Sequence, residues 1–143
     1  MKLLVGASLS LLCLCTACAE APDEQATQDY LERLVRSQIQ YYVEQGEFTT
    51  RFDQLGVFPP EPSLHNYEIS LREPQRLDFW AMPERSRTYG YIGTLGGGSA
   101  FAGLSALICQ SQQPGVSQPP KVRLEKRQLI CPTGYEEFSR LTQ

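Results

Sequence analysis

Five cysteines are the residues of this chain best suited to chemistry, and their spacing divides them into two groups. Cys13, Cys15 and Cys18 follow one another closely near the N-terminus, whereas Cys109 and Cys131 stand far apart in the second half. The distant pair is not a C-x-x-C redox motif. In an exported chain this pair is expected to form a disulfide, worth about 3 kcal/mol for a loop of this length, with two buried free thiols as the alternative.

The N-terminal cysteines belong to a predicted secretory signal in residues 1–18. Lys2 precedes an apolar run over residues 3–14. This run is shorter than the roughly 20 apolar residues of a membrane-spanning helix, and small residues follow it, as is typical of a signal peptide. Residues 19–24 are then a tether, and residues 25–143 form the globular domain.

Cys18 is the predicted site of lipidation. The sequence Thr16-Ala17-Cys18 resembles the end of a lipobox, in which the cysteine becomes the acylated first residue of the mature chain. Cys15 stands at a position where such signals usually carry leucine. Cleavage after Ala19 between small residues is the alternative. We expect an exported protein, periplasmic or at the outer envelope, that is held at the membrane by a lipid anchor if Cys18 is acylated.

The remaining polar motifs do not form a catalytic set. The only histidine, His65, has no cysteine or carboxylate at metal-ligand spacing, so it is expected to be a surface loop residue. No G-x-S-x-G elbow surrounds Ser99 or Ser105. The glycines at 96–98 lack the lysine of a phosphate-binding loop, and Phe101 stands where a dinucleotide motif needs glycine. We therefore expect no enzyme activity, no metal and no cofactor.

Three aromatic residues, Trp80, Tyr89 and Tyr91, are the candidate binding surface. Aromatic rings can stack on a sugar or on the bases of a single-stranded nucleic acid. Aromatic residues in strands more often pack on the face of a sheet, and this second interpretation is preferred. A small ligand-binding module of the glycan type nevertheless remains the alternative function.

Bulk charge gives no indication of a nucleic-acid partner. The 143 residues carry a formal net charge of -3 and are 41% hydrophobic, which is ordinary for one globular domain. The basic-rich residues 121–127 include Glu125, and a solvated strand edge explains them without a ligand. No nucleic-acid binding is expected.

An amphipathic helix is the element on which the rest of the domain is expected to be built. From Asp29 onward, apolar residues recur at helical spacing until Gly46, which favours a left-handed stop. Such a helix must cover a large flat partner, and a sheet is the natural one. The predicted buried stripe comprises Leu31, Leu34, Val35, Gln38, Ile39 and Tyr42.

The pattern changes to a period of two in the second half of the chain. Residues 66–73 and 76–82 alternate on either side of a short turn, which predicts a β-hairpin. Residues 88–95 and the apolar run 104–109 predict two further strands. Residues 121–124 are expected at an exposed edge, residues 129–131 return to the core, and the last residues are expected to be a short tail. The predicted fold is α+β, a helix on an antiparallel sheet of about four strands.

The order of these features resembles a known family. The chain is similar to the globular part of the type IV pilin-like G and H proteins, the cyanobacterial kind of pilin or pseudopilin. The resemblance covers about residues 25–135. It rests on the ordered motifs Arg36-Ser37-Gln38-Ile39-Gln40-Tyr41-Tyr42, Asn66-Tyr67, Tyr89-Gly90-Tyr91, Ile108-Cys109-Gln110-Ser111, Pro114-Gly115 and Cys131-Pro132-Thr133-Gly134-Tyr135.

The resemblance implies a non-enzymatic protein with a helix on an antiparallel sheet and a C-terminal loop closed by the cysteine pair. Its implied partners are pilins or secretion-system proteins. Pilins of this kind carry a long apolar assembly helix after a glycine cleavage site, with a nearby glutamate. A secretory or lipoprotein signal stands at this place instead, so we expect an accessory or binding role rather than that of an ordinary filament subunit.

Overall fold

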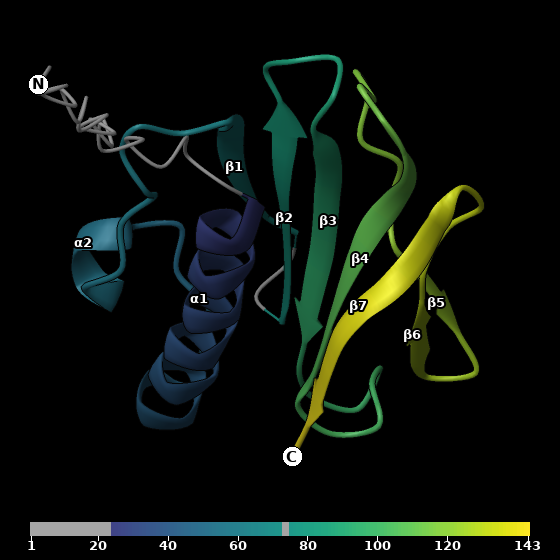
Figure 1. The fold of residues 1–143 in the computed structure, drawn as a ribbon. Helices are drawn as coiled ribbons and strands as arrows, with labels where there is room; N and C mark the ends of the chain where they lie inside the picture. The colour runs from purple at the N-terminus through teal and green to yellow at the C-terminus, as the bar shows by residue number, and fades with distance from the viewer. Residues whose placement is uncertain (1–23, 73–74) are drawn as a thin grey trace, which may run out of the picture.

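The computed structural model describes residues 24–72 and 75–143 and is shown in Figure 1. In these ranges two helices, α1 (Glu24–Gln45) and α2 (Phe52–Leu55), precede seven strands. The strands are β1 (His65–Leu71), β2 (Arg76–Pro83), β3 (Tyr89–Gly96), β4 (Ser105–Pro114), β5 (Arg123–Glu125), β6 (Gln128–Ile130) and β7 (Tyr135–Thr142).

Five of these strands form one antiparallel sheet in the order β1-β2-β3-β4-β7. The predicted hairpin is confirmed, because β1 and β2 pair from His65 opposite Pro83 to Leu71 opposite Leu77. Its turn falls largely on residues 73–74, outside the described residues. The α+β class is confirmed, with five strands in the main sheet where about four were expected.

The additional strand is β7, and the prediction of a C-terminal tail is wrong. β7 pairs with β4 along its whole length, and the register shifts where Ile108 faces Ser139 and Cys109 faces Glu137. Phe138 is therefore the extra residue of a β-bulge. The bulge breaks the strict alternation of apolar residues, so the segment lacks the period of two by which a strand is recognised.

Helix α1 buries the predicted stripe against the sheet. Tyr30, Leu31, Leu34 and Val35 are each at most 1% exposed. The helix ends at Gly46, whose φ of 78° is left-handed and whose backbone N–H donates to the carbonyl of Tyr42 over 2.8 Å. Both the buried face and the stop of this helix are as the sequence predicted.

The one polar member of the stripe, Gln38, is fully buried and forms hydrogen bonds with the loop after the helix. Its Nε2 donates to the carbonyl of Thr49 over 2.5 Å, and its Oε1 accepts from the backbone N–H of Thr49 over 3.2 Å. One amide side chain thus satisfies both backbone groups of a buried loop residue.

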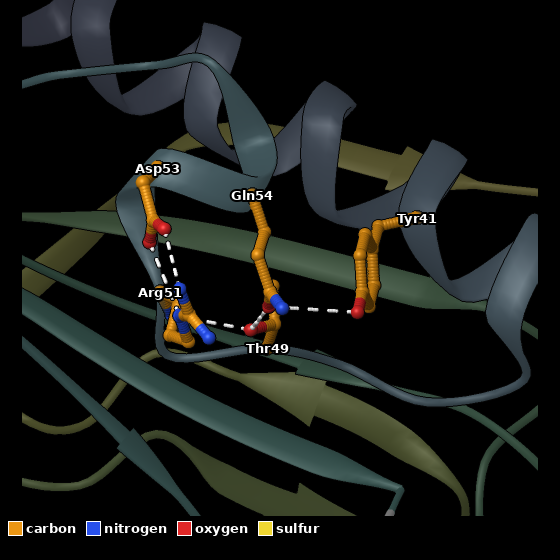
Figure 2. A network of polar contacts seen from close by, with 5 residues as sticks. All are labelled: Tyr41, Thr49, Arg51, Asp53 and Gln54. Atoms are coloured by element: carbon orange, nitrogen blue, oxygen red, sulfur yellow. Dashed lines mark hydrogen bonds and ion pairs between the residues drawn. The ribbon is translucent and has the colours of Figure 1, made fainter.

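Figure 2 shows how the same loop is held beneath α1. The Thr49 hydroxyl donates to Gln54 Oε1 over 2.6 Å and accepts the backbone N–H of Arg51 over 3.1 Å. Tyr41 of α1 reaches the same Gln54 oxygen at 3.5 Å. The Arg51–Asp53 ion pair is mostly exposed and contributes little to stability, so the polar contacts of Thr49 and Gln54 position α2.

The sheet has a hydrophobic core on each face, with α1 on one side and the β5–β6 hairpin on the other (Figure 1). Leu77, Phe79 and Ala81 alternate toward α1. On the opposite face the core is formed by Ile92, Phe101, Leu107, Cys109, Val122 and Leu129. Of residues 121–124, which were expected at an exposed edge, Arg123 and Leu124 lie in β5, an exposed strand of a separate two-stranded sheet.

Candidate functional site

The predicted disulfide is confirmed, and it fixes the segment that covers the second face of the sheet. Cys109 lies fully buried in β4 and is bonded to Cys131, just after β6. The bond closes a loop of 22 residue steps. Inside this loop, Val122 and Leu129 are 4% and 2% exposed in the second core. The disulfide and these two apolar anchors hold the covering segment against β3 and β4.

A groove remains between this segment and β2, and we refer to it as the β2 groove. It consists of a cavity of about 200 Å³, lined by residues that include Trp80, Ile92 and Pro119, and a second cavity of about 430 Å³. Both cavities are lined by Arg72, Lys121 and Val122. The shared lining residues show that the two cavities are neighbours near the starts of β2 and β5, and the name covers both.

Asp78 organises the positive charges of this groove. Its carboxylate is 3.1 Å from the Nε of Arg72 and 3.1 Å from the Nε of Arg76. Thr94 donates its hydroxyl to the same carboxylate over 2.6 Å, and Asp78 itself is 7% exposed. Arg76 also donates to the carbonyl of Val122 over 3.0 Å, which links β2 to the covering segment. The nearly buried carboxylate thus hydrogen-bonds Arg76 and forms an ion pair, without a hydrogen bond, with Arg72.

The structure separates the three predicted aromatic residues. Trp80 packs on the second core, beside the groove, and its Nε1 donates to Glu68 over 2.9 Å. Tyr89 and Tyr91 pack on the α1 side of the sheet. Successive side chains of a strand point to opposite faces of the sheet. Trp80 is paired with Ile92, and both lie on the face away from α1, whereas Tyr91, next to Ile92, lies on the α1 face. The three rings therefore do not share one surface, and ligand binding by them stays a prediction.

Tyr91 is inaccessible in this structure. It is 0% exposed, its ring meets Phe138 edge-on at 5.9 Å, and its hydroxyl accepts from Gln28 of α1 over 3.0 Å. Burial raises the pKa of Tyr91 to about 12. This residue joins α1 to the sheet, whereas Trp80 lines a cavity that a ligand can enter.

The expectation that His65 is a surface residue is wrong. It is 2% exposed, its Nε2 donates to the carbonyl of Tyr89 over 2.7 Å, and its Nδ1 is 2.9 Å from the Thr27 hydroxyl. Thr27 in turn lies 2.9 Å from the Tyr67 hydroxyl. Desolvation lowers the pKa of His65. Sequence reasoning missed this role because the partners lie 24 and 38 residues away.

Other kinds of site find no support in the described part of the chain. Residues 24–72 and 75–143 contain no group of three or more histidine, cysteine, aspartate or glutamate side chains placed to hold a metal ion. Across the same ranges no helix is long and apolar enough to cross a membrane. Cys18, the predicted lipidation site, and the predicted signal lie outside the described residues.

An N-terminal helix packed on an antiparallel sheet, with a disulfide closing the C-terminal segment, places this domain in the class of pilin-like globular heads. A family model described as Type IV pilin-like G and H matches residues 24–132. The chain therefore belongs to the type IV pilin-like G and H family. No curated protein and no solved structure matches it.

Membership in this family supports a type IV pilus-related protein. Pilin-like proteins are typically structural rather than catalytic, and the family suggests an exported protein of the envelope that associates with pilus or secretion components. The match ends at residue 132, so the edge strand β7 lies beyond it.

Proposed function

We propose that this chain is a non-enzymatic binding or accessory protein of the cell envelope, acting with type IV pili or with the pseudopilins of type II secretion. The observation that carries the proposal is the match to the pilin-like family. In this head the apolar stripe of α1 is buried against the sheet of the same chain, so the stripe is not available to a partner. The surfaces left for partners are the solvated face of α1, the outer edges of β1 and β7, and the disulfide-closed segment.

Chemical crosslinking in cells that make the protein tests this role. A tagged chain should enrich pilins or secretion pseudopilins over the level seen with an unrelated tagged envelope protein, after denaturing purification and mass spectrometry. A distance-limited crosslinker should join them to lysines of this chain such as Lys121 or Lys126. Repeated absence of any pilus or secretion component among the crosslinked proteins would refute the proposal.

The proposed location is the envelope surface or the periplasm, with Cys18 acylated as the membrane anchor. The lipobox-like sequence ending at Cys18 is the support for this step. The anchored form should start at Cys18 and carry a diacylglyceryl mass. A Cys18→Ala chain should leave the membrane fraction, whereas a Cys15→Leu chain, which brings the signal closer to the usual lipobox, should stay there. An unmodified chain starting at Glu20 would overturn the anchor.

Ligand binding by the β2 groove is the second candidate function. The specific observation in its favour is that Trp80 lines a cavity together with charged side chains, separate from the core beneath α1. Of the three predicted aromatic residues, only Trp80 lines this groove, because Tyr89 and Tyr91 pack on the α1 face and Tyr91 is fully buried there. Retention on an immobilised glycan array, lost on Trp80→Ala without loss of folding, tests it.

A further inference from the structure

The β2 groove concentrates positive charge on a chain that is negative overall. Arg72, Arg76 and Lys121 line it, and Asp78 is the only carboxylate among its lining residues. The groove thus carries a surplus of positive charge, although the whole chain has a formal charge of -3. Lys121 makes no ion pair within the described residues. Local charge of this sign attracts an anionic group.

Arg72 lies beside a carboxylate that is itself held in place. Arg72 Nε forms an ion pair with Asp78 Oδ2 at 3.1 Å but no hydrogen bond, so the guanidinium donors stay available to a ligand. Thr94 and Arg76 fix Asp78 from two further directions. A guanidinium positioned in advance loses less conformational freedom when it binds a carboxylate, and paired N–H donors suit that group.

The groove also has apolar lining residues. Trp80 and Ile92 of the sheet and Pro119 and Pro120 of the covering segment all line its smaller cavity. Glu68 already accepts the indole N–H, so Trp80 offers a ligand its ring rather than a hydrogen bond. The cavity of about 200 Å³ lies below the roughly 300–1,000 Å³ of sites for drug-sized ligands, and suits one ring of a larger molecule. The adjoining cavity provides space for the next unit.

We infer that the β2 groove binds an acidic saccharide, with the carboxylate of a uronic acid unit held by Arg72 and Lys121 and a sugar ring lying against Trp80. This inference rests on the ligand-binding candidate above and specifies the chemistry of its ligand; it does not depend on the pilus-related role. A nucleic acid gains its affinity from many phosphate contacts, whereas this groove offers two or three cations on a chain of formal charge -3, so a short acidic saccharide fits it better.

The disulfide is part of this site. Pro119, Pro120 and Lys121 lie within the loop that Cys109 and Cys131 close. Reduction should release this wall, so the affinity for the saccharide should fall although β2 and β3 keep their pairing. This dependence links the pilin-like disulfide to ligand binding.

Isothermal titration of the purified, oxidised protein tests the inference. The probes are tetragalacturonate, its methyl ester, which has the same rings and linkages without charge, a glucuronate-containing tetrasaccharide, and oligothymidylate. We expect the acidic saccharides to bind and the ester to bind at least about tenfold more weakly, as expected when a charge-assisted hydrogen bond is lost. Raising the salt concentration should weaken binding of the acidic probes.

Matched variants test which side chains of the groove bind the saccharide. Arg72→Gln and Lys121→Gln should each weaken tetragalacturonate binding by about tenfold. Arg87→Gln, an exposed arginine beyond the other end of β2, removes the same charge and should change nothing. Trp80→Ala should lose binding, whereas Trp80→Phe, which keeps a ring, should retain part of it; thermal unfolding shows whether either variant folds.

Three outcomes overturn the inference. Equal binding of the acid and its methyl ester would leave the ligand-binding candidate standing but remove the acidic specificity. Tighter binding of oligothymidylate through the same residues would assign the groove to single-stranded nucleic acid. Absence of binding by every saccharide at millimolar concentration would refute both the inference and the candidate function on which it rests.

Discussion

Acidification should destabilise the folded protein through His65. A backbone carbonyl only accepts, so the 2.7 Å contact with Tyr89 places the ring proton on Nε2. Nδ1 of the neutral ring then accepts from the Thr27 hydroxyl, which accepts in turn from Tyr67. A second proton on the ring would oppose the Thr27 donor and place a charge in a site that is 2% exposed.

The direction and the size of the change in unfolding free energy with pH follow from the difference between the His65 pKa values of the folded and unfolded chains. Desolvation holds the folded-state pKa of His65 below its ordinary value of 6.5, although the hydrogen bond to the Tyr89 carbonyl and the negative charges of Glu24 and Glu84 raise it in part. Between these two pKa values the unfolded chain binds a proton that the folded chain does not, so stability falls as the pH falls. The loss is at most about 1.4 kcal/mol between about pH 8 and about pH 5.5.

Urea unfolding across this pH range, followed by fluorescence of the single tryptophan, measures the effect. His65→Gln keeps an amide donor and an acceptor but does not titrate, so the difference between the two proteins isolates His65 from the carboxylates. Thr27→Val should reduce the slope, because the neutral ring loses its donor and the folded-state pKa rises. An equal pH dependence in the wild-type protein and His65→Gln would refute the reasoning.

Three further predictions concern the packing of the domain. Gly93→Ala should cost about 1–3 kcal/mol, because an added Cβ would overlap the Phe79 ring, and Phe79→Leu should recover part of the loss in urea unfolding. Replacing Cys109 and Cys131 by serine should lower the free energy of unfolding by about 3 kcal/mol, and an unchanged urea midpoint would contradict the role given to the loop. Gln38→Leu should cost about 1–3 kcal/mol by leaving the buried backbone groups of Thr49 unpaired, whereas Gln40→Leu on the exposed side should stay within about 0.5 kcal/mol.

The sequence determined those parts of the fold that depend on local pattern. The spacing of apolar residues fixed the buried face of α1, and Gly46 fixed its end, because a helix exposes a definite stripe and needs a left-handed residue to stop. Alternation in the same way identified the β1–β2 hairpin. The cysteine pair was also predictable, because two cysteines remain after the signal in a chain expected to be exported.

The tertiary structure alone decided which distant residues meet. It placed Trp80 and Tyr91 on opposite faces of the sheet, buried His65 against Thr27, and gathered Arg72 and Lys121 beside Trp80. These contacts join segments far apart in the chain, so no local period contains them. The place of β7 in the sheet was also decided by the tertiary structure. Its sequence does not alternate strictly because of the bulge, but its pairing with β4 along the whole strand makes it part of the sheet.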